Sequence, residues 1–390
     1  RSTLFPYTTL FRSTNLCDNA MRRQVLSLPD LMESQYLDLE ARARKVLPTP
    51  EIFRIQKIIL TGCGDSLAAG MAAKYAFESV AGIPTECVPS IDLSRFYSEI
   101  HLGFYPNNSL VIAVSNSGQI ARIGEAVQRA HKFGAKVLGV TANEQSLLGK
   151  NSDYIMKISI PTFESASGVR TYLVSLMALL LLAVRFSEVR GKITMDMADV
   201  YRNDFGSQAN LLRSLLPKMD QDCLQVAAKW KGYPAFDFIG SGSDYGTAWY
   251  GHAKVFEATG KFAMCANSED WLHLNVFMRD VNQIGTIIIA GSENAAMSRT
   301  KETMTHIAEL GRPSILITDG DLDGFGSQIE KICIPSASFS FMSPLTQFCP
   351  IALLMGYIAV MIGEKDGRGC EGKWSFCEGG GAVKNSEIFL

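Results

Sequence analysis

The chain has 390 residues, 47% of which are hydrophobic, and a formal net charge of -2. This length is enough for two domain-sized cores, and the apolar content excludes a disordered chain. A net charge near zero, with no basic stripe, argues against nucleic acid as a partner.

The first thirteen residues, Arg1 to Ser13, are basic, rich in Ser, Thr, Leu and Phe, and free of Asp and Glu. This composition is typical of an organelle-targeting peptide. Residues 3–13 also match, residue for residue, the in-frame translation of a widely used sequencing adapter, and we favour this origin. Residues 1–13 are therefore treated as an adapter artefact and left out of the fold prediction, with Met21 as a candidate start.

Residues 21–50 are predicted to form an N-terminal helical segment. Apolar residues recur there at near-helical spacing with many charges between them, which is typical of one or two helices packed on a larger body. The apolar positions are Val25, Leu28, Leu31, Met32 and Leu37.

The rest of the chain contains an internal repeat. The stretch from Ile58 and the stretch from Phe236 each have an apolar run, a glycine-rich turn and a helical segment in which A-K is followed by F-E and a final glycine. Residues 131–143 and 308–320 match again, at a constant offset of 177 positions from Gly134/Gly311 to Thr141/Thr318. The two halves therefore look like copies of one unit.

Each copy alternates short, continuous apolar runs with helical segments, which is the pattern of parallel strands covered on both faces. The predicted fold class is α/β, with two tandem doubly wound lobes. We place the first lobe at 51–190, a helical linker broken at Pro217 at 191–231, the second lobe at 232–363 and a glycine-rich tail at 364–390.

Two apolar runs, 172–186 and 345–363, are long enough to raise the question of a membrane. The first is short for a span, and the second carries Gln347 and Pro350 near its start, so both are predicted to be buried helices. The nine cysteines contain no C-x-x-C pair and are typical of reduced thiols in the cytoplasm. Cys370 and Cys377 could pair, but free thiols are favoured.

Three turns in the first lobe carry small hydroxyl residues. The SNSG turn, Ser115 to Gly118, follows an apolar run and precedes a helical stretch, so its hydroxyls, backbone N–H groups and helix N-terminus suit a phosphate. Any one serine of this kind could simply cap a helix. Three such turns together favour a phosphate site. The candidate substrate-binding residues are Ser66, Ser115, Asn116, Ser117, Ser165 and Ser167.

At these turns the chain resembles the sugar isomerase (SIS) domain family, and in layout the tandem isomerase half of glucosamine-6-phosphate synthase. The family patterns C-G-T-S, S-Q-S-G-E-T and V-A-S-T correspond to C-G-D-S at 63–66, S-N-S-G-Q-I at 115–120 and S-A-S-G at 165–168. In the second lobe, GHAKVFEAT at 251–259 and SEDWLHLN at 268–275 resemble the family's catalytic segments. The resemblance implies that Lys254, Glu257 and His273 are functional.

The chemistry of a sugar isomerase fits these residue types. Lys254 and Glu257, at positions i and i+3, can share one face of a helix, although such a pair alone could be an ordinary surface ion pair. A 1,2-proton shift needs a carboxylate that moves a proton between C1 and C2, and ring opening needs a second group. Glu257 suits the first role and His273 the second. His252 is expected to serve in packing or at an interface.

The chain also departs from the family pattern. Ile120 and Asp65 replace threonines of the phosphate turns, and a carboxylate beside a phosphate would weaken binding unless it points away. The family's His-Gly-Pro is His273-Leu274-Asn275 here. The tail does not match the synthase, so that Lys384 is only the nearest candidate for the lysine that meets the open-chain carbonyl. No glutaminase segment is visible.

The resemblance therefore implies a phosphosugar isomerase or deglycase that acts on a keto- or amino-sugar 6-phosphate by a glutamate-mediated proton shift. The free cysteines favour the cytoplasm, and the resemblance implies a homodimer. No metal or redox cofactor and no nucleic acid or membrane partner is expected. The alternative is a non-catalytic regulator that binds a sugar phosphate. The identity of the sugar, the amine and the direction of reaction stay open.

Overall fold

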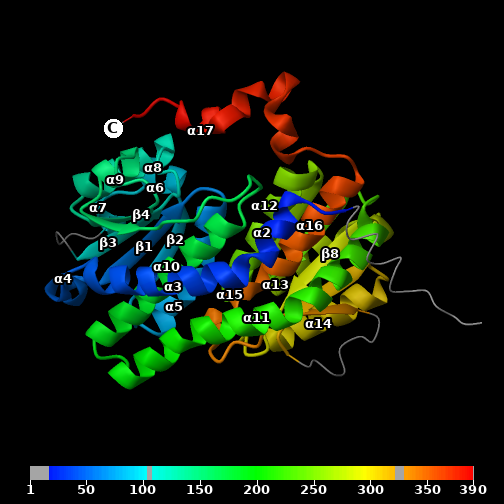
Figure 1. Cartoon of the computed structure of the whole chain (residues 1–390), viewed down its shortest axis with the longest axis horizontal. Coiled ribbons are helices and arrows are strands. Elements are labelled where there is room, and N and C mark those ends of the chain that lie inside the picture. Colours follow the sequence, from blue (N-terminus) through cyan, green and yellow to red (C-terminus); the bar gives the residue numbers. More distant parts are fainter. Residues whose placement is uncertain (1–16, 103–107, 321–328, 390) are drawn as a thin grey trace, which may run out of the picture.

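The computed structural model describes residues 17–102, 108–320 and 329–389, and two α/β lobes lie side by side in it (Figure 1). The proposed adapter segment, residues 1–13, lies outside the described residues. Each lobe is built on a five-stranded parallel sheet. Because apolar runs such as 110–114 are buried on both faces, helices must cover both sides of each sheet.

The first sheet has the order β2-β1-β3-β4-β5. Its strands are β1 (Lys57–Gly62), β2 (Thr85–Pro89), β3 (Ser109–Val114), β4 (Lys136–Thr141) and β5 (Tyr154–Lys157). The helices of this lobe are α5 (Asp65–Ser79), α6 (Ser90–Arg95), α7 (Glu99–Leu102), α8 (Ala121–Lys132), α9 (Leu147–Lys150) and α10 (Arg170–Val189).

The second sheet, β7-β6-β8-β9-β10, repeats this order strand for strand. Its strands are β6 (Ala235–Ile239), β7 (Phe262–Ala266), β8 (Ile284–Ile289), β9 (Ser314–Thr318) and β10 (Glu330–Cys333). Its helices are α12 (Ser243–Lys254), a π-helical turn η1 (Val255–Thr259), α13 (Ser268–His273), α14 (Met297–Glu309), α15 (Pro344–Gln347) and α16 (Cys349–Met361), with short 3-10 turns at η2 (Asn275–Phe277), η3 (Val281–Gln283) and η4 (Ser340–Met342).

The register of the two sheets confirms the predicted repeat. Ile58 pairs with Thr85 and Leu110, and Phe236 pairs in the same way with Ala263 and Gly285. The turns that follow are also alike, because Gly64 (φ 55, ψ -129) and Gly242 (φ 61, ψ -127) hold the same left-handed conformation before α5 and α12. A side chain at either position would be strained, so both turns require glycine.

Helices before and between the lobes tie them together. The N-terminal segment forms α2 (Ala20–Leu26), α3 (Leu28–Lys45) and α4 (Thr49–Arg54), as its spacing predicts. Leu37, however, is 73% exposed and does not belong to the buried face. The predicted break at Pro217 is wrong: α11 (Met195–Trp230) runs through it as one 36-residue helix along both lobes (Figure 1). Burial of its apolar face, including Leu212, outweighs the hydrogen bond that proline removes.

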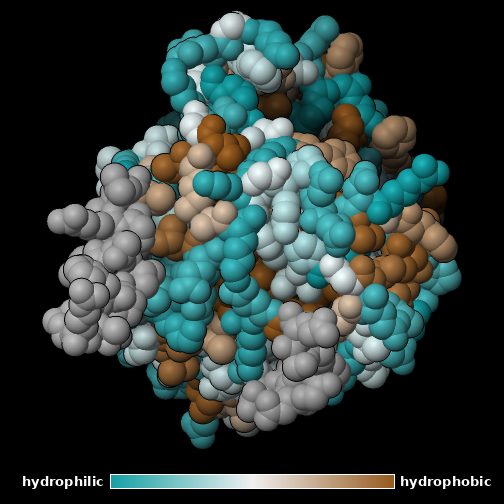
Figure 2. All heavy atoms as spheres, turned by 90° about the vertical axis from the view of Figure 1, so that its right-hand side faces the viewer, coloured by the Kyte–Doolittle hydropathy of each residue, from teal (hydrophilic) through white to brown (hydrophobic). Residues whose placement is uncertain are grey.

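The two long apolar segments are core helices. By length and composition alone, 170–189 and 340–361 could cross a membrane, but 83% and 89% of their apolar windows are buried inside the fold. One buried apolar cluster joins both segments to α11 and to both sheets. The surface of the second lobe, by contrast, mixes hydrophilic and hydrophobic side chains (Figure 2). All nine cysteines, which lie within the described residues, are free, Cys370 and Cys377 included.

The glycine-rich tail crosses back from the second lobe to the first (Figure 1). It forms η5 (Asp366–Cys370), η6 (Gly372–Gly380) and α17 (Gly381–Lys384). Its end lies against α8, where Arg122 Nη2 donates to Ser386 Oγ at 3.1 Å and the Phe389 N–H donates to Glu125 at 2.6 Å. The tail therefore returns past the carboxyl edge of the first sheet.

Candidate functional site

Two of the three hydroxyl-rich turns follow strands of the first sheet directly, at its carboxyl edge. Ser66 is the second residue of α5, directly after the β1 turn. Residues 115–118 connect β3 to the segment before α8, and 165–168 precede α10. The segments 63–66 and 165–168 touch, because a Cβ on Gly168 would come 2.0 Å from Asp65 Oδ2.

The β3 turn is held by its own hydroxyl groups. Ser115 is buried, and its Oγ accepts the Gly118 N–H at 3.1 Å. The left-handed Gly118 (φ 65) is required, since a Cβ there would come 2.0 Å from Ser146 Oγ. Asn116 Oδ1 is buried and has no hydrogen-bond partner among the described residues. This oxygen is an acceptor, so it suits a ligand hydroxyl group, whereas a phosphate oxygen would have to accept from Asn116 Nδ2.

A cavity of about 320 Å³ opens beside this turn. Asn116 and Ser165, two of the predicted substrate-binding residues, line it from opposite segments of the first lobe. Gln24, Arg170 and Thr171 are also in its wall. This volume is at the lower end of those typical of small-molecule sites.

The second lobe reaches the first through α5 and α12. These helices lie very close together, because a Cβ on Gly246 would lie 2.4 Å from the backbone nitrogen of Ala72. They run antiparallel, because Lys254 at the end of α12 contacts Asp65 at the start of α5. The N-terminus of α5 therefore meets the C-terminus of α12. At that end Lys254 Nζ lies 2.7 Å from Asp65 Oδ1 and also binds the Glu257 carboxylate.

Lys254 is fully buried between these two carboxylates. Its ammonium lies 5.0 Å from the ring centroid of Tyr250, whose hydroxyl donates to the Gly168 carbonyl at 3.0 Å. Burial by itself would lower the pKa of Lys254, but Asp65 and Glu257 outweigh it and raise that pKa above the ordinary lysine value. Lys254 therefore stays charged and fixes both acids.

Glu257 is the exposed member of this group, with 41% of its side chain accessible. Desolvation raises the pKa of Glu257, and Asp65 adds to the rise while Lys254 opposes it. A carboxyl group whose pKa is raised is suited to accept and return a proton.

The contact with Lys254 also explains why this chain can carry Asp65 where the family pattern has a threonine. A carboxylate in a phosphate turn would repel the ligand if it pointed toward it. Asp65 instead points into the second lobe, where the ammonium of Lys254 neutralises it. Ser66, the next residue, keeps its place in the turn.

The backbone around Glu257 differs from the simple helix face that the spacing predicts. Lys254 is the last residue of α12, and Glu257 lies in the π-helical turn η1, which Gly260 (φ 66) ends in a left-handed conformation. Such π turns are rare and occur often at functional sites.

The tail covers part of this site. Ser167 Oγ donates to Asp366 Oδ1 at 2.5 Å, and Arg368 Nη2 donates to the Glu257 carbonyl at 3.2 Å. Lys384 lies further along, exposed, with its ammonium on the Gly379 carbonyl. Asp366 and Arg368, rather than Lys384, are the tail residues that contact the site.

His273 has different partners from Glu257 within the chain. Its Nε2 lies 3.0 Å from Glu269 Oε1, its side chain is 69% exposed, and Glu269 also accepts from Arg299 at 2.6 Å. The single chain therefore gathers Lys254 and Glu257 but leaves His273 in a surface group of the second lobe. His252 packs edge-on against Trp249, with ring centroids 5.0 Å apart.

Three residues of the site escaped the sequence analysis: Arg170, Tyr250 and Asp366. Arg170 is a lone cation at the start of a very apolar helix, which is a signal that could have found it. Tyr250 resembles any core aromatic residue, and Asp366 resembles any tail acid. Nothing in the sequence brings either of them to the site.

The fold has two α/β lobes whose sheets share one strand order. Residues 51–185 match the SIS domain family, so the first lobe is a SIS domain.

The chain is homologous to the isomerase portion of glutamine–fructose-6-phosphate aminotransferases. The protein from Mesorhizobium japonicum is 23% identical over 351 residues, covering 88% of this chain and 56% of that protein. The protein from Thermotoga maritima is 26% identical over 68% of this chain and 42% of its own length. The chain spans about half the length of the curated relatives it matches.

Solved structures support the same fold. The C-terminal domain of glucosamine-fructose-6-phosphate aminotransferase from Francisella tularensis has a TM-score of 0.78 at 18% identity, covering 90% of this chain and 98% of that one. Tagatose-6-phosphate ketose/aldose isomerase from Escherichia coli has a TM-score of 0.71 at 17% identity, covering 89% and 95%. At these identities the likeness concerns the fold.

Proposed function

We propose that this chain is a phosphosugar isomerase or deglycase that acts on a keto- or amino-sugar 6-phosphate. One observation carries the proposal. The half-exposed Glu257 carboxylate is held by the buried Lys254 at the contact between lobes, beside the hydroxyl turns of the first lobe. A non-catalytic sugar-phosphate sensor would need the turns but not this pair.

In the proposed reaction Glu257 moves a proton along the open-chain sugar. Its carboxylate takes the proton from C1 of a ketose and returns it at C2, which converts ketose to aldose through an enediol. With an amino-ketose, loss of the C1 proton gives an enaminol, and reprotonation at C2 leaves an imine that water hydrolyses to amine and sugar phosphate. One positioned carboxyl group therefore serves both outcomes, and such groups typically contribute about 10²- to 10⁴-fold.

The phosphate end of the substrate is proposed to bind at the turns of the first lobe. The proposed donors are Ser66, Asn116 and Ser117, together with Ser165 and Ser167 from the segment before α10, and Asn116 and Ser165 line one cavity. Hydroxyl and backbone N–H donors at helix N-termini are typical ligands of phosphate. Nine free thiols suit the reducing cytoplasm as the place of the reaction.

His273 is proposed to act from a second copy of the chain. Its segment is exposed and unusually apolar, with Leu274 68% and Phe277 79% accessible. Large exposed apolar side chains next to a polar group are typical of an interface. A homodimer that covers this segment would bring His273 to the partner's Glu257, where it could assist ring opening.

The test uses fructose 6-phosphate, glucosamine 6-phosphate and fructosamine 6-phosphates with wild type and Glu257→Gln. We expect the variant to lose about 10²-fold or more in kcat while binding the substrate. Glu309→Gln, an exposed acid paired with His306, is the matched control and should keep wild-type kcat. Unchanged turnover in Glu257→Gln would reject the proposed mechanism.

A mixing experiment tests the second copy. Glu257→Gln and His273→Gln are each expected to be inactive alone. When they are unfolded and refolded together, mixed dimers would hold one site with both native residues, so activity should return. Mixtures that stay inactive despite forming mixed dimers would place His273 outside the site.

A further inference from the structure

Arg170 is a buried cation without an acidic partner in the part of the chain that the structure describes. It is the first residue of α10 and only 7% exposed. Its Nη1 donates to Ser27 Oγ at 2.6 Å and its Nη2 to the Pro161 carbonyl at 3.3 Å, while Nε has no hydrogen-bond partner among the described residues. Burial lowers the pKa of Arg170, although a guanidinium remains protonated at neutral pH. Buried arginines are normally paired, so this one is unusual.

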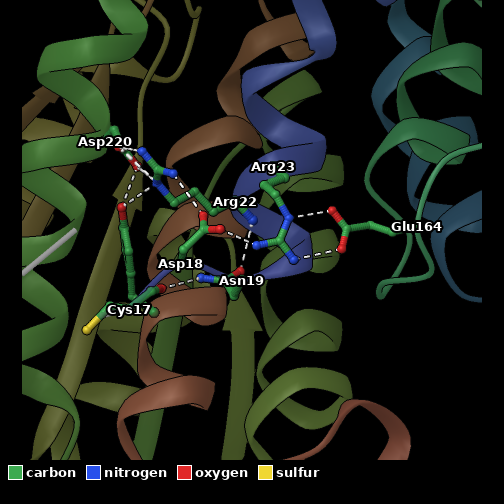
Figure 3. A network of polar contacts seen from close by, with 8 residues as sticks. Cys17, Asp18, Asn19, Arg22, Arg23, Glu164 and Asp220 are labelled. Carbon is green, nitrogen blue, oxygen red and sulfur yellow. Dashed lines mark hydrogen bonds and ion pairs between the residues drawn. The ribbon is translucent and has the colours of Figure 1, made fainter. Parts of the chain in front are cut away.

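The acidic residue nearest to Arg170 in the sequence, Glu164, already has a cationic partner. Glu164 also lines the cavity, but its two oxygens accept from Arg23 Nε and Nη2 at 2.5 and 2.7 Å (Figure 3). Gln24, between them in the cavity wall, donates to the Glu164 carbonyl and accepts the Arg170 N–H. Glu164 therefore stabilises the segment that covers the cavity and leaves Arg170 without a carboxylate, with the Phe163 ring 4.5 Å from its guanidinium carbon.

Two other cations near the hydroxyl turns already have acidic partners, and the first, Arg122 in α8, pairs with Glu125 at 2.7 Å. Lys254, the buried cation at the lobe contact, is shared between the carboxylates of Asp65 and Glu257. A bound phosphate dianion would find hydrogen-bond donors at the turns, but Lys254 could not balance it. Arg170 lines the same cavity as Asn116 and Ser165, together with the hydroxyl residue Thr171.

We propose that this cavity binds an oxyanion of the substrate, with Arg170 supplying the positive charge and Asn116 and Thr171 supplying hydrogen bonds. The proposal rests on the proposed function and adds a specificity-determining residue to it. The oxyanion has two possible sources: the phosphate of the sugar, or a carboxylate on the amine substituent of a fructosamine phosphate. A planar guanidinium binds either group in a bidentate manner.

The main experiment is calorimetry of the full chain with inorganic phosphate and with fructose 6-phosphate. Arg170→Gln is compared with Arg190→Gln, directly after the other end of α10, where the guanidinium Nη1 donates to the backbone carbonyls of Ile52 and Ile55. If the oxyanion is the sugar phosphate, Arg170→Gln should weaken both ligands at least tenfold and Arg190→Gln should not.

A second pair of ligands separates the two sources. Fructosamine 6-phosphates with a carboxylate-bearing amine and with a neutral amine are compared in the same variants. If the oxyanion is the amine carboxylate, Arg170→Gln should weaken only the carboxylate-bearing ligand, again at least tenfold. Wild-type affinity of Arg170→Gln for every ligand would overturn the proposal.

Thr171→Val keeps the shape of a half-buried side chain and removes its hydroxyl group. It provides a second test in case the arginine variant does not fold. It should weaken the same ligands severalfold, and if Arg170→Gln does not fold, wild-type binding by Thr171→Val overturns the proposal. These measurements need no turnover. A failure of Glu257→Gln to change kcat would therefore reject the proposed reaction and leave this binding result to stand or fall separately.

Discussion

The two lobes share one topology but differ at the same point of the same turn. The glycines of the two turns correspond, Gly62 with Gly240 and Gly64 with Gly242, so Ser66 of the first lobe corresponds to Asp244 of the second. The Asp244 carboxylate is buried and accepts the Gly291 N–H at 2.9 Å, Asn294 Nδ2 at 2.8 Å and Gln347 Nε2 at 2.8 Å. The second lobe thus carries its own anion where the first has a hydroxyl group.

This difference indicates that the two copies of the lobe have different roles in binding. In the second lobe the donors of the turn are satisfied by a side chain, which leaves that turn closed to a phosphate. In the first lobe the corresponding residue, Ser66, carries a hydroxyl group in place of that carboxylate, and Asp366 on the tail is joined by one exposed hydrogen bond to Ser167. One pair of lobes is therefore expected to hold one substrate, with Glu257 supplied by the closed lobe.

The largest expected effect comes from breaking the contact between the lobes. Lys254→Met would leave Asp65 and Glu257 facing each other without a cation, and loss of one partner of a buried ion pair typically costs about 3–5 kcal/mol. We expect the free energy of unfolding, measured with urea, to fall by that amount. Lys229→Met, which removes an exposed pair with Glu330, should change it by less than about 1 kcal/mol. Equal, small effects would mean that the pair does not join the lobes.

The filled turn of the second lobe predicts a pH dependence. Desolvation raises the pKa of Asp244 to about 6. The native state then holds this proton more tightly than the unfolded state, so its contribution to stability is present at low pH and is lost as pH rises from about 4 through 6. The stability of wild type relative to Asp244→Asn should therefore fall over that range, on the order of 2 kcal/mol.

Asp153→Asn is the control of opposite sign. Burial alone would raise the pKa of Asp153, but its bonds from Lys136, the Val137 N–H and His131 lower it overall. The stability of wild type relative to that variant should rise with pH through the acid range. Urea unfolding at a series of pH values measures both differences. A flat difference for Asp244→Asn would mean that the carboxylate is not a buried anion.

The smallest effect concerns the tail over the first lobe. Asp366→Asn removes the negative charge that lies beside the Ser167 hydroxyl group. Fructose 6-phosphate should therefore bind about three- to tenfold more tightly, on the order of 1 kcal/mol. Glu371→Gln, another tail acid, paired with Lys365 at the surface, should leave the affinity unchanged. Weaker binding in Asp366→Asn would show that the tail assists the ligand rather than competing with it.

Much of this architecture could be predicted from local patterns. The parallel sheets follow from continuous apolar runs, and the duplication follows from glycines such as Gly64 and Gly242, whose backbone conformation no other residue adopts cheaply. The helix break predicted at Pro217 is wrong because the local rule against proline does not consider how much of the apolar face of α11 is buried along both lobes. Leu37 misled it because helical spacing does not say which of several apolar residues meets the core.

The sequence by itself determined the fold class, the repeat and the residue types of the candidate site, because these depend on period, glycine and short spacing. Only the tertiary structure decided which polar groups meet: Asp65 with Lys254 across the lobes, Asp366 with Ser167, and Arg170 with no acid among the described residues. Electrostatic partners are chosen by distance in space, and residues 189 and 199 positions apart become neighbours only when helices pack.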